Sequence, residues 1–125
     1  MSYIYFNPNP LKRSAGDCVI RAFCLLNGRD WESNYMALTH QGFMLCDMPS
    51  SNRVWESYLR QHGYKKHILS EDGHNVREFC HTHPYGKYLL ALDGHVVAVN
   101  NGNYYDTWDS GDDIPMYYWE KEQII

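Results

Sequence analysis

Cys18 is the residue of this chain whose position most favours nucleophilic chemistry. It stands at the start of an apolar helical pattern, directly after Gly16-Asp17, where the chain can turn sharply into a helix. The first turn of a helix offers unpaired N–H groups and the positive end of the helix dipole, and both stabilise an anion. A thiol placed there ionises more readily, and the thiolate is the nucleophilic form. Taken alone, the position also suits a cysteine that is simply a small first-turn residue.

His95 is the second candidate for chemistry. It follows the two-residue turn Asp93-Gly94 and opens the apolar strand pattern Val96-Val97-Ala98-Val99. A histidine at the start of a buried strand lies at a rim from which its side chain can reach a cleft. There an imidazole can act as a general base or as the cationic partner of a thiolate. The alternative interpretation is a half-exposed turn histidine.

Asp106 is the candidate for orienting that histidine. Asn101-Gly102 is a strong hairpin signal, and a hairpin centred on it pairs residues whose numbers sum to about 203. Asp106 then faces Val97, one step from His95 on the same face of the sheet. A carboxylate there can accept the imidazole N–H and hold the ring in one tautomer. Trp108, two residues further on, is expected to shield this hydrogen bond from water.

Other side chains near these three are weaker candidates for a catalytic role. Asp17 is expected at the helix N-cap, beside the same cleft. The carboxylates of Asp109, Asp112 and Asp113 compete with Asp106 for the orienting role, but we interpret them as a solvated acidic turn. Cys80-His81-Thr82-His83 holds possible metal ligands, yet no second pair with suitable spacing completes a zinc tetrahedron. We therefore predict neither a metal site nor a cofactor.

The elements that must position these residues come in an α+β order, helices first and an antiparallel sheet second. Apolar spacing predicts the helices and period-two or turn-bounded apolar runs predict the strands. Helices are predicted over about 17–27, 31–40 (ended by Gly42), 51–61 and from Asn75, and strands over 88–92, 95–99, 103–108 and 116–119, with another possible at 64–69. Residues 1–15 are predicted to be irregular. The expectation is one domain over 1–125, with an N-terminal helical part (about 16–84) packed on a C-terminal sheet part (about 85–120).

The motifs resemble those of papain-like cysteine peptidases. The run Gly16-Asp17-Cys18-Val19-Ile20-Arg21-Ala22 is similar to their nucleophile helix, and the segments 94–99 and 105–110 are similar to their histidine strand and the strand after it. Asp106-Thr107-Trp108-Asp109 stands where papain-like enzymes carry Asn-Ser-Trp-Gly. Aspartate in that role is similar to the bacteriocin-processing peptidase domains of ABC exporters, and the small helical-first layout is similar to the Josephin deubiquitinases. The resemblance covers most of the chain in order, and implies a papain-like fold with Cys18 as nucleophile, His95 as base and Asp106 as orienting residue.

Two departures from the papain-like pattern concern the oxyanion hole. The Cys-Gly-Ser/Ala-Cys-Trp/Tyr signature around the nucleophile is absent. The Gln or Asn five or six residues before the cysteine is also missing, since Arg13 and Lys12 occupy those positions. Asn9, or Asn7, could fold back from the irregular arm as the side-chain donor, with the backbone N–H of Cys18 as the second donor.

The composition and charge of the chain indicate which partners and which cellular compartment to expect. The chain has 125 residues, 44% of them hydrophobic, and 11 basic against 15 acidic side chains, so its net charge is −4. The basic pairs Lys12-Arg13 and Lys65-Lys66 are too short for a nucleic-acid stripe. No apolar run approaches the roughly 20 residues of a membrane helix, and residues 1–6 lack a signal-peptide pattern. We therefore expect a cytoplasmic protein with four reduced cysteines and no nucleic-acid or membrane partner.

These features together predict a cysteine-nucleophile hydrolase, a peptidase or isopeptidase that acts on a peptide or protein through a thioester. Two alternatives stay open. One is a catalytically inactive papain-like binding protein of phage or mobile-element type, which the missing Gln favours. The other is a transglutaminase-like acyltransferase, which keeps the thiol chemistry but passes the acyl group to an amine.

Overall fold

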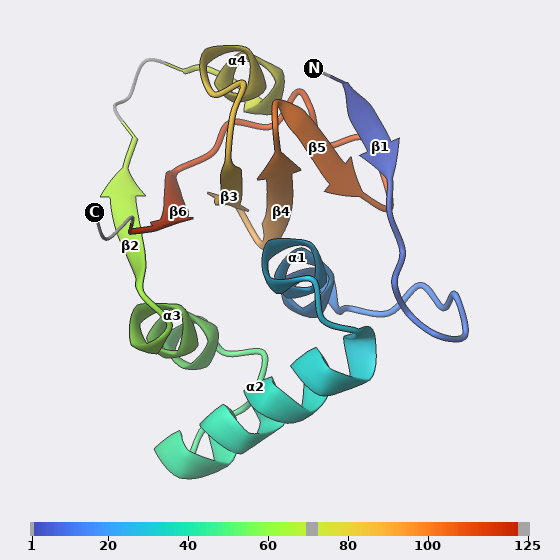
Figure 1. Cartoon of the computed structure of the whole chain (residues 1–125), viewed down its shortest axis with the longest axis vertical. Coiled ribbons are helices and arrows are strands. Elements are labelled where there is room, and N and C mark those ends of the chain that lie inside the picture. Colours follow the sequence, from blue (N-terminus) through green and yellow to red (C-terminus); the bar gives the residue numbers. More distant parts are fainter. Residues whose placement is uncertain (1, 70–72, 123–125) are drawn as a thin grey trace.

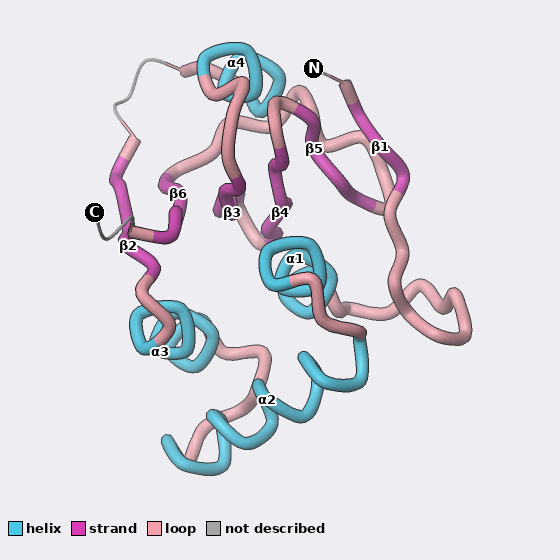
Figure 2. Tube along the Cα trace, in the orientation of Figure 1, coloured by secondary structure: helices cyan, strands magenta, loops and turns pink. Residues whose placement is uncertain are grey.

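In the part of the chain that the structure describes, a six-stranded sheet with four helices forms the framework (Figures 1 and 2). The structure is a computed structural model that describes residues 2–69 and 73–122. The strands are β1 (Tyr3–Tyr5), β2 (Tyr64–Ile68), β3 (Lys87–Leu92), β4 (His95–Asn100), β5 (Asn103–Asp106) and β6 (Tyr117–Lys121), in the spatial order β1-β5-β4-β3-β6-β2. The helices are α1 (Cys18–Asn27), α2 (Trp31–Leu45), α3 (Asn52–Gln61) and α4 (Val76–Thr82). The predicted α+β class is confirmed.

The sheet is mixed, so the prediction of an antiparallel sheet is wrong at one edge. β1 runs parallel to β5, with Tyr5 opposite Asp106, although residues 1–15 were predicted to be irregular. The remaining pairs are antiparallel. β2 forms the other edge from within the part predicted to be helical, and the possible strand at 64–69 is thereby confirmed. The division into a helical part and a later sheet part therefore fails at both edges.

Helices cover both faces of the sheet. Val96 and Ala98 of β4 pack with buried residues of α1, α2 and α3, whereas Val97 and Val99 pack with buried residues of α4. This alternation follows from the two-residue period of a strand. The four helices thus do not form one lobe, since α4 lies across the sheet from the other three (Figure 1). Within the described ranges, no helix is long and apolar enough to cross a bilayer.

The hairpin between β4 and β5 has the predicted register. Ala98 pairs with Tyr105 and Val99 with Tyr104, so the numbers of each pair sum to 203 (98 + 105 and 99 + 104). The turn residue Asn101 has φ 50°, and the glycine after it has φ 78°, which is the left-handed backbone that an Asn-Gly turn supplies. Because the two strands are antiparallel, the first residue of β4 and the last residue of β5 reach the same end of the sheet.

Gly42 was predicted to end α2, but it lies inside the helix. The helix continues to Leu45, and Cys46 closes it with a left-handed φ of 54°. The chain then folds back onto the helix, and Asp47 N–H donates to the carbonyl of Gly42 at 2.9 Å. A Cβ on residue 42 would lie 2.8 Å from the carbonyl oxygen of Asp47 and 3.2 Å from the nitrogen of Pro49. The glycine is therefore required for a close approach of two backbone segments.

We expect Gly42→Ala to lower the free energy of unfolding by about 1–3 kcal/mol, because the added methyl group meets backbone atoms that cannot rotate away. Urea denaturation measures this change. Gly16→Ala is the matched control, since a Cβ at residue 16 meets no neighbouring atom within 4 Å. Equal stabilities for the two variants would contradict the close-approach interpretation of Gly42.

Candidate active site

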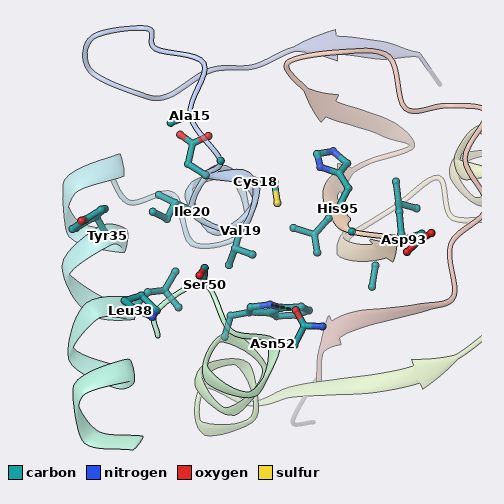
Figure 3. A pocket seen from close by; sticks show the side chains of 18 of the residues that line it. Ala15, Cys18, Val19, Ile20, Tyr35, Leu38, Ser50, Asn52, Asp93 and His95 are labelled. Carbon is teal, nitrogen blue, oxygen red and sulfur yellow. Dashed lines mark hydrogen bonds between the residues drawn. The ribbon is translucent and has the colours of Figure 1, made fainter. Parts of the chain in front are cut away.

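An apolar cavity lies between the start of α1, the inner side of α2, the loop before α3 and the turn that joins β3 to β4. It is a cleft of about 680 Å³ (Figure 3). Cys18 lies on one of its walls and His95 on another. The remaining walls are mainly apolar, and include Val19, Ile20, Trp31, Tyr35, Leu38, Pro49, Trp55 and Met116. Pro49 and Ser50 of the loop before α3, with Asn52 at the start of α3, form another wall of the cleft.

Cys18 is the first residue of α1, and its sulfur lies beside the imidazole of His95 (Figure 3). Burial alone would raise the pKa of the Cys18 thiol. Hydrogen bonds from His95 and from the backbone of Val96, together with the positive charges of His95 and Arg21, lower that pKa below its ordinary value of 9.0. The environment of Cys18 therefore favours the thiolate.

His95 is the first residue of β4, and its ring links Cys18 to Asp106. Nε2 donates to Oδ2 of Asp106 at 2.7 Å, which leaves Nδ1 as the ring nitrogen for the Cys18 sulfur. Burial alone would lower the pKa of His95, but its hydrogen bonds with Asp106 and Cys18 and their negative charges raise it to about 9. A thiol with a lowered pKa beside an imidazole with a raised pKa is an arrangement that stabilises a thiolate–imidazolium pair.

Asp106 ends β5 and is only 1% exposed. Besides His95, its Oδ2 accepts from Ser110 Oγ at 3.0 Å. Its Oδ1 accepts from the backbone N–H of Thr107 at 2.8 Å and from Arg21 Nη2 at 3.3 Å. Four donors therefore fix the carboxylate in one orientation, which in turn fixes the ring of His95. The structure thus brings Cys18, His95 and Asp106 together from α1, β4 and β5.

Trp108 and Asp17 also lie beside this group. The Trp108 ring packs against the imidazole of His95, with 4.9 Å between ring centroids, so it covers the His95 ring on one side. Asp17 lines the cleft and occupies the N-cap position of α1, as predicted, but its side chain makes no capping hydrogen bond to the helix. Its carboxylate instead accepts from Trp31 Nε1 at 2.9 Å and pairs with Arg21. The first-turn amides of α1 are thus left without a side-chain cap from residue 17.

Asn9 is not where an oxyanion donor would have to be, and its prediction needs correction. Its side-chain oxygen accepts from the backbone N–H of Leu11 at 2.9 Å, which closes a local turn. Asn7 likewise accepts from the backbone N–H of Asn9 at 3.2 Å. Neither residue belongs to the described side chains that line the cleft. Pro8 and Pro10, which follow these two asparagines, favour the turns that keep both amides within the arm.

Arg21 and Ser110 are the site residues that sequence reasoning missed. Arg21 is 7% exposed and bonds both Asp17 and Asp106. The available signal was a charged residue four positions after Asp17, set among the apolar residues of a helix, which is the spacing of an i,i+4 ion pair. Ser110 gave no such signal, because its contact with Asp106 depends on the turn that follows β5.

Two of the three competing carboxylates, those of Asp109 and Asp112, are bound to other groups. Asp109 accepts from Tyr104 Oη at 2.6 Å, and Arg77 pairs with Asp109 and Asp112. The acidic turn is therefore partly ordered by Arg77 and Tyr104 rather than wholly solvated. His95 takes its carboxylate partner from Asp106.

The other three cysteines lack the environment of Cys18. Burial raises the pKa of Cys24, and raises the pKa of Cys80 to about 11. Cys46 is exposed at the end of α2. All four are free thiols. Across residues 2–69 and 73–122, no three His, Cys, Asp or Glu side chains gather as a metal would need.

No family model, curated protein or solved structure matches this chain. The chemistry of the site must therefore be argued from its own geometry. That geometry comprises a thiol with a lowered pKa, an imidazole beside it and a buried carboxylate behind the imidazole, at the wall of an open apolar cleft.

Proposed function

We propose that this protein is a cysteine hydrolase of papain-like type, which cleaves an amide or isopeptide bond through a thioester acyl-enzyme. The observation that carries the proposal is the continuous contact from Cys18 through His95 to Asp106. A nucleophile, a base and an orienting group in mutual hydrogen-bond reach are the parts that acyl transfer needs. The helix-borne cysteine and sheet-borne histidine and aspartate support the papain-like layout, as do the sequence motifs around them.

The reaction follows from the protonation states that the site favours. The Cys18 thiolate attacks the carbonyl carbon, and its electron pair forms the carbon–sulfur bond as the carbonyl oxygen becomes an oxyanion. The His95 imidazolium gives its proton to the departing amine, and the carbon–nitrogen bond breaks to leave a thioester. Neutral His95 then takes a proton from water, whose oxygen attacks the thioester. Release of the carboxylic acid regenerates the thiolate and the imidazolium.

Backbone amides of α1 are the oxyanion donors that the proposal uses. Cys18, Val19 and Ile20 all line the cleft, and the helix start has no side-chain cap from Asp17. The N–H of Cys18 and the positive end of the helix dipole can therefore stabilise negative charge on a carbonyl oxygen next to the sulfur. The substrate is a peptide or protein segment that enters the apolar cleft. A reducing cytoplasm is the compartment that suits a free catalytic thiol.

The absence of a side-chain oxyanion donor from Asn9 favours one second candidate, a papain-like protein that binds a partner without turning it over. The two functions differ in one observable step. A hydrolase forms and breaks an acyl-enzyme, whereas a binding protein forms none.

We test the proposal by incubating the protein with p-nitrophenyl acetate and following p-nitrophenolate release and protein mass. A Cys46→Ser background removes the exposed competing thiol. We expect a burst of one p-nitrophenolate per chain, an acetyl group on Cys18, and its slow loss to water. Cys18→Ser is expected to show no burst. Added primary amine separates hydrolysis from a transglutaminase-like transfer, since only transfer yields the acetylamide. No acetylation of Cys18 would contradict the proposal and leave the binding protein.

A further inference from the structure

The strongest feature outside the three proposed catalytic residues is a buried cation one helical turn after Cys18. The side chain of Arg21 is 9% exposed and lies between two carboxylates, each still less exposed. Nη1 bonds Oδ1 of Asp17, and Nη2 bonds Oδ1 of Asp106 at 3.3 Å. Asp17 in turn accepts from Trp31 of the cleft wall, and Asp106 accepts from His95. A single guanidinium therefore bridges the cleft wall and the carboxylate that holds the proposed base.

Stability alone does not account for a charged group at this place. Buried ion pairs carry a large desolvation penalty, and well-packed apolar residues often replace them without loss of stability. The neighbours of Arg21 in α1 are Ala22 and Phe23, which belong to the hydrophobic core. The charges point instead to a requirement of the chemistry at the proposed active site.

The charges around Cys18 indicate what that requirement is. Without Arg21, the buried carboxylates of Asp17, the residue before Cys18, and of Asp106, the partner of His95, would have no cation between them, and nearby negative charge disfavours a thiolate. With Arg21, one of those two charges is offset. The charged and titratable groups that face Cys18 or its cleft are Asp17 just before α1, Arg21 on α1, Tyr35 on α2, His95 on β4, Asp106 on β5, Tyr117 on β6 and Asp93 in the turn before β4.

We infer that Arg21 is an electrostatic positioning residue of this site, which offsets the charge of Asp17 and Asp106 so that the Cys18–His95 pair can carry a thiolate and an imidazolium. The inference rests on the proposed function, because it gives Arg21 a part in the reactivity of Cys18. Arg21 acts through Asp106 and through space, and does not touch the substrate. The negative charge of Asp17, the second carboxylate bound to Arg21, acts opposite to Arg21 and disfavours the Cys18 thiolate.

The test is the pH profile of Cys18 alkylation by iodoacetamide, followed by mass spectrometry in a Cys46→Ser background between about pH 5 and about pH 10. Arg21→Gln removes the positive charge, so we expect the acid limb of the profile to move to higher pH. A movement of about one pH unit corresponds to about tenfold slower labelling below the limb. Asp17→Asn removes a negative charge and should move the same limb to lower pH. Arg21→Lys keeps the charge and should leave the limb close to that of the wild type.

Opposite shifts in Arg21→Gln and Asp17→Asn support the inference, because a purely structural network would alter rates without moving the limb in two directions. Shifts in the same direction, or unmoved limbs in both, overturn it. Should circular dichroism show that Arg21→Gln does not fold, Asp17→Asn decides, since its asparagine can still accept from Trp31. An unmoved limb in that variant then overturns the inference. If wild-type Cys18 itself labels only with the pH dependence of an ordinary thiol, it is the proposed function that fails.

Discussion

Replacing His95 with alanine should slow the alkylation of Cys18 at neutral pH by a factor of at least about ten. Two of the influences that lower the pKa of Cys18, the hydrogen bond from His95 and its positive charge, are lost, while burial continues to raise that pKa. Each unit of change in pKa alters the thiolate fraction about tenfold below the pKa. The measurement is the rate of iodoacetamide labelling of Cys18, resolved from the other thiols by peptide mass spectrometry.

His62→Ala is the matched control for this prediction. His62 caps the end of α3, and its Nδ1 contacts the carbonyl of Tyr58, far along the chain from the residues of the site. Its removal should leave the labelling of Cys18 unchanged. Equal, slow labelling of wild type and His95→Ala would show that the Cys18 and His95 side chains do not form a reactive pair. That result would contradict the hydrolase proposal.

Asp106→Asn should lower the free energy of unfolding by about 3 kcal/mol, because it removes the negative member of a buried charge network. The asparagine amide presents an NH₂ group where one carboxylate oxygen accepted from two donors. Arg21 then keeps a single carboxylate partner, Asp17. Urea denaturation at neutral pH measures the loss. A decrease below about 1 kcal/mol, the typical range of a surface ion pair, would contradict a role for Asp106 in holding the buried network together.

The same substitution has an expected pH dependence, best measured in a Cys18→Ala background where the thiol does not titrate. His95 has an ordinary pKa of 6.5, which its partners raise to about 9 in the folded protein. A raised folded-state pKa contributes stability that is fully present below pH 6.5 and is lost as pH rises through the folded pKa. Without Cys18, burial still lowers the pKa of His95 and the hydrogen bond and charge of Asp106 still raise it. We expect a fall in stability across this window in Cys18→Ala, and a flatter profile when Asp106→Asn is added.

Much of the site was predictable from sequence because its signals are local. The Asn-Gly turn fixes the register of β4 and β5, and the register brings residues 95 and 106 to one end of the sheet. The helix predicted from Asn75 is α4, and a capping box of Asn75 and Glu78 marks its start. The apolar spacing of α1 places Cys18 at a helix start. Each of these depends on residues within a few positions of one another.

The features that were missed depend on contacts between distant segments. β1 has three residues and is held by parallel pairing to β5, a hundred positions away, so no local pattern reveals it. Its pairing nevertheless matters to the site, because Phe6 N–H donates to the carbonyl of Asp106 at 2.9 Å. Gly42 was misread as a helix stop because the segment that approaches it, residues 47–49, lies outside the helix pattern. The role of Arg21 was not predicted, because it depends on two partners and one of them, Asp106, comes from a distant strand.

The central claim, a thiolate stabilised at Cys18 by His95, is tested most directly by the ultraviolet absorbance of the thiolate during a pH titration. The signal of Cys18 is obtained as the difference between the protein and its Cys18→Ser variant. We expect that signal to be half developed below pH 9.0, the ordinary pKa of the thiol, and to move to higher pH in His95→Ala. A wild-type signal that develops only at pH 9.0 or higher, unchanged by loss of His95, would contradict the claim.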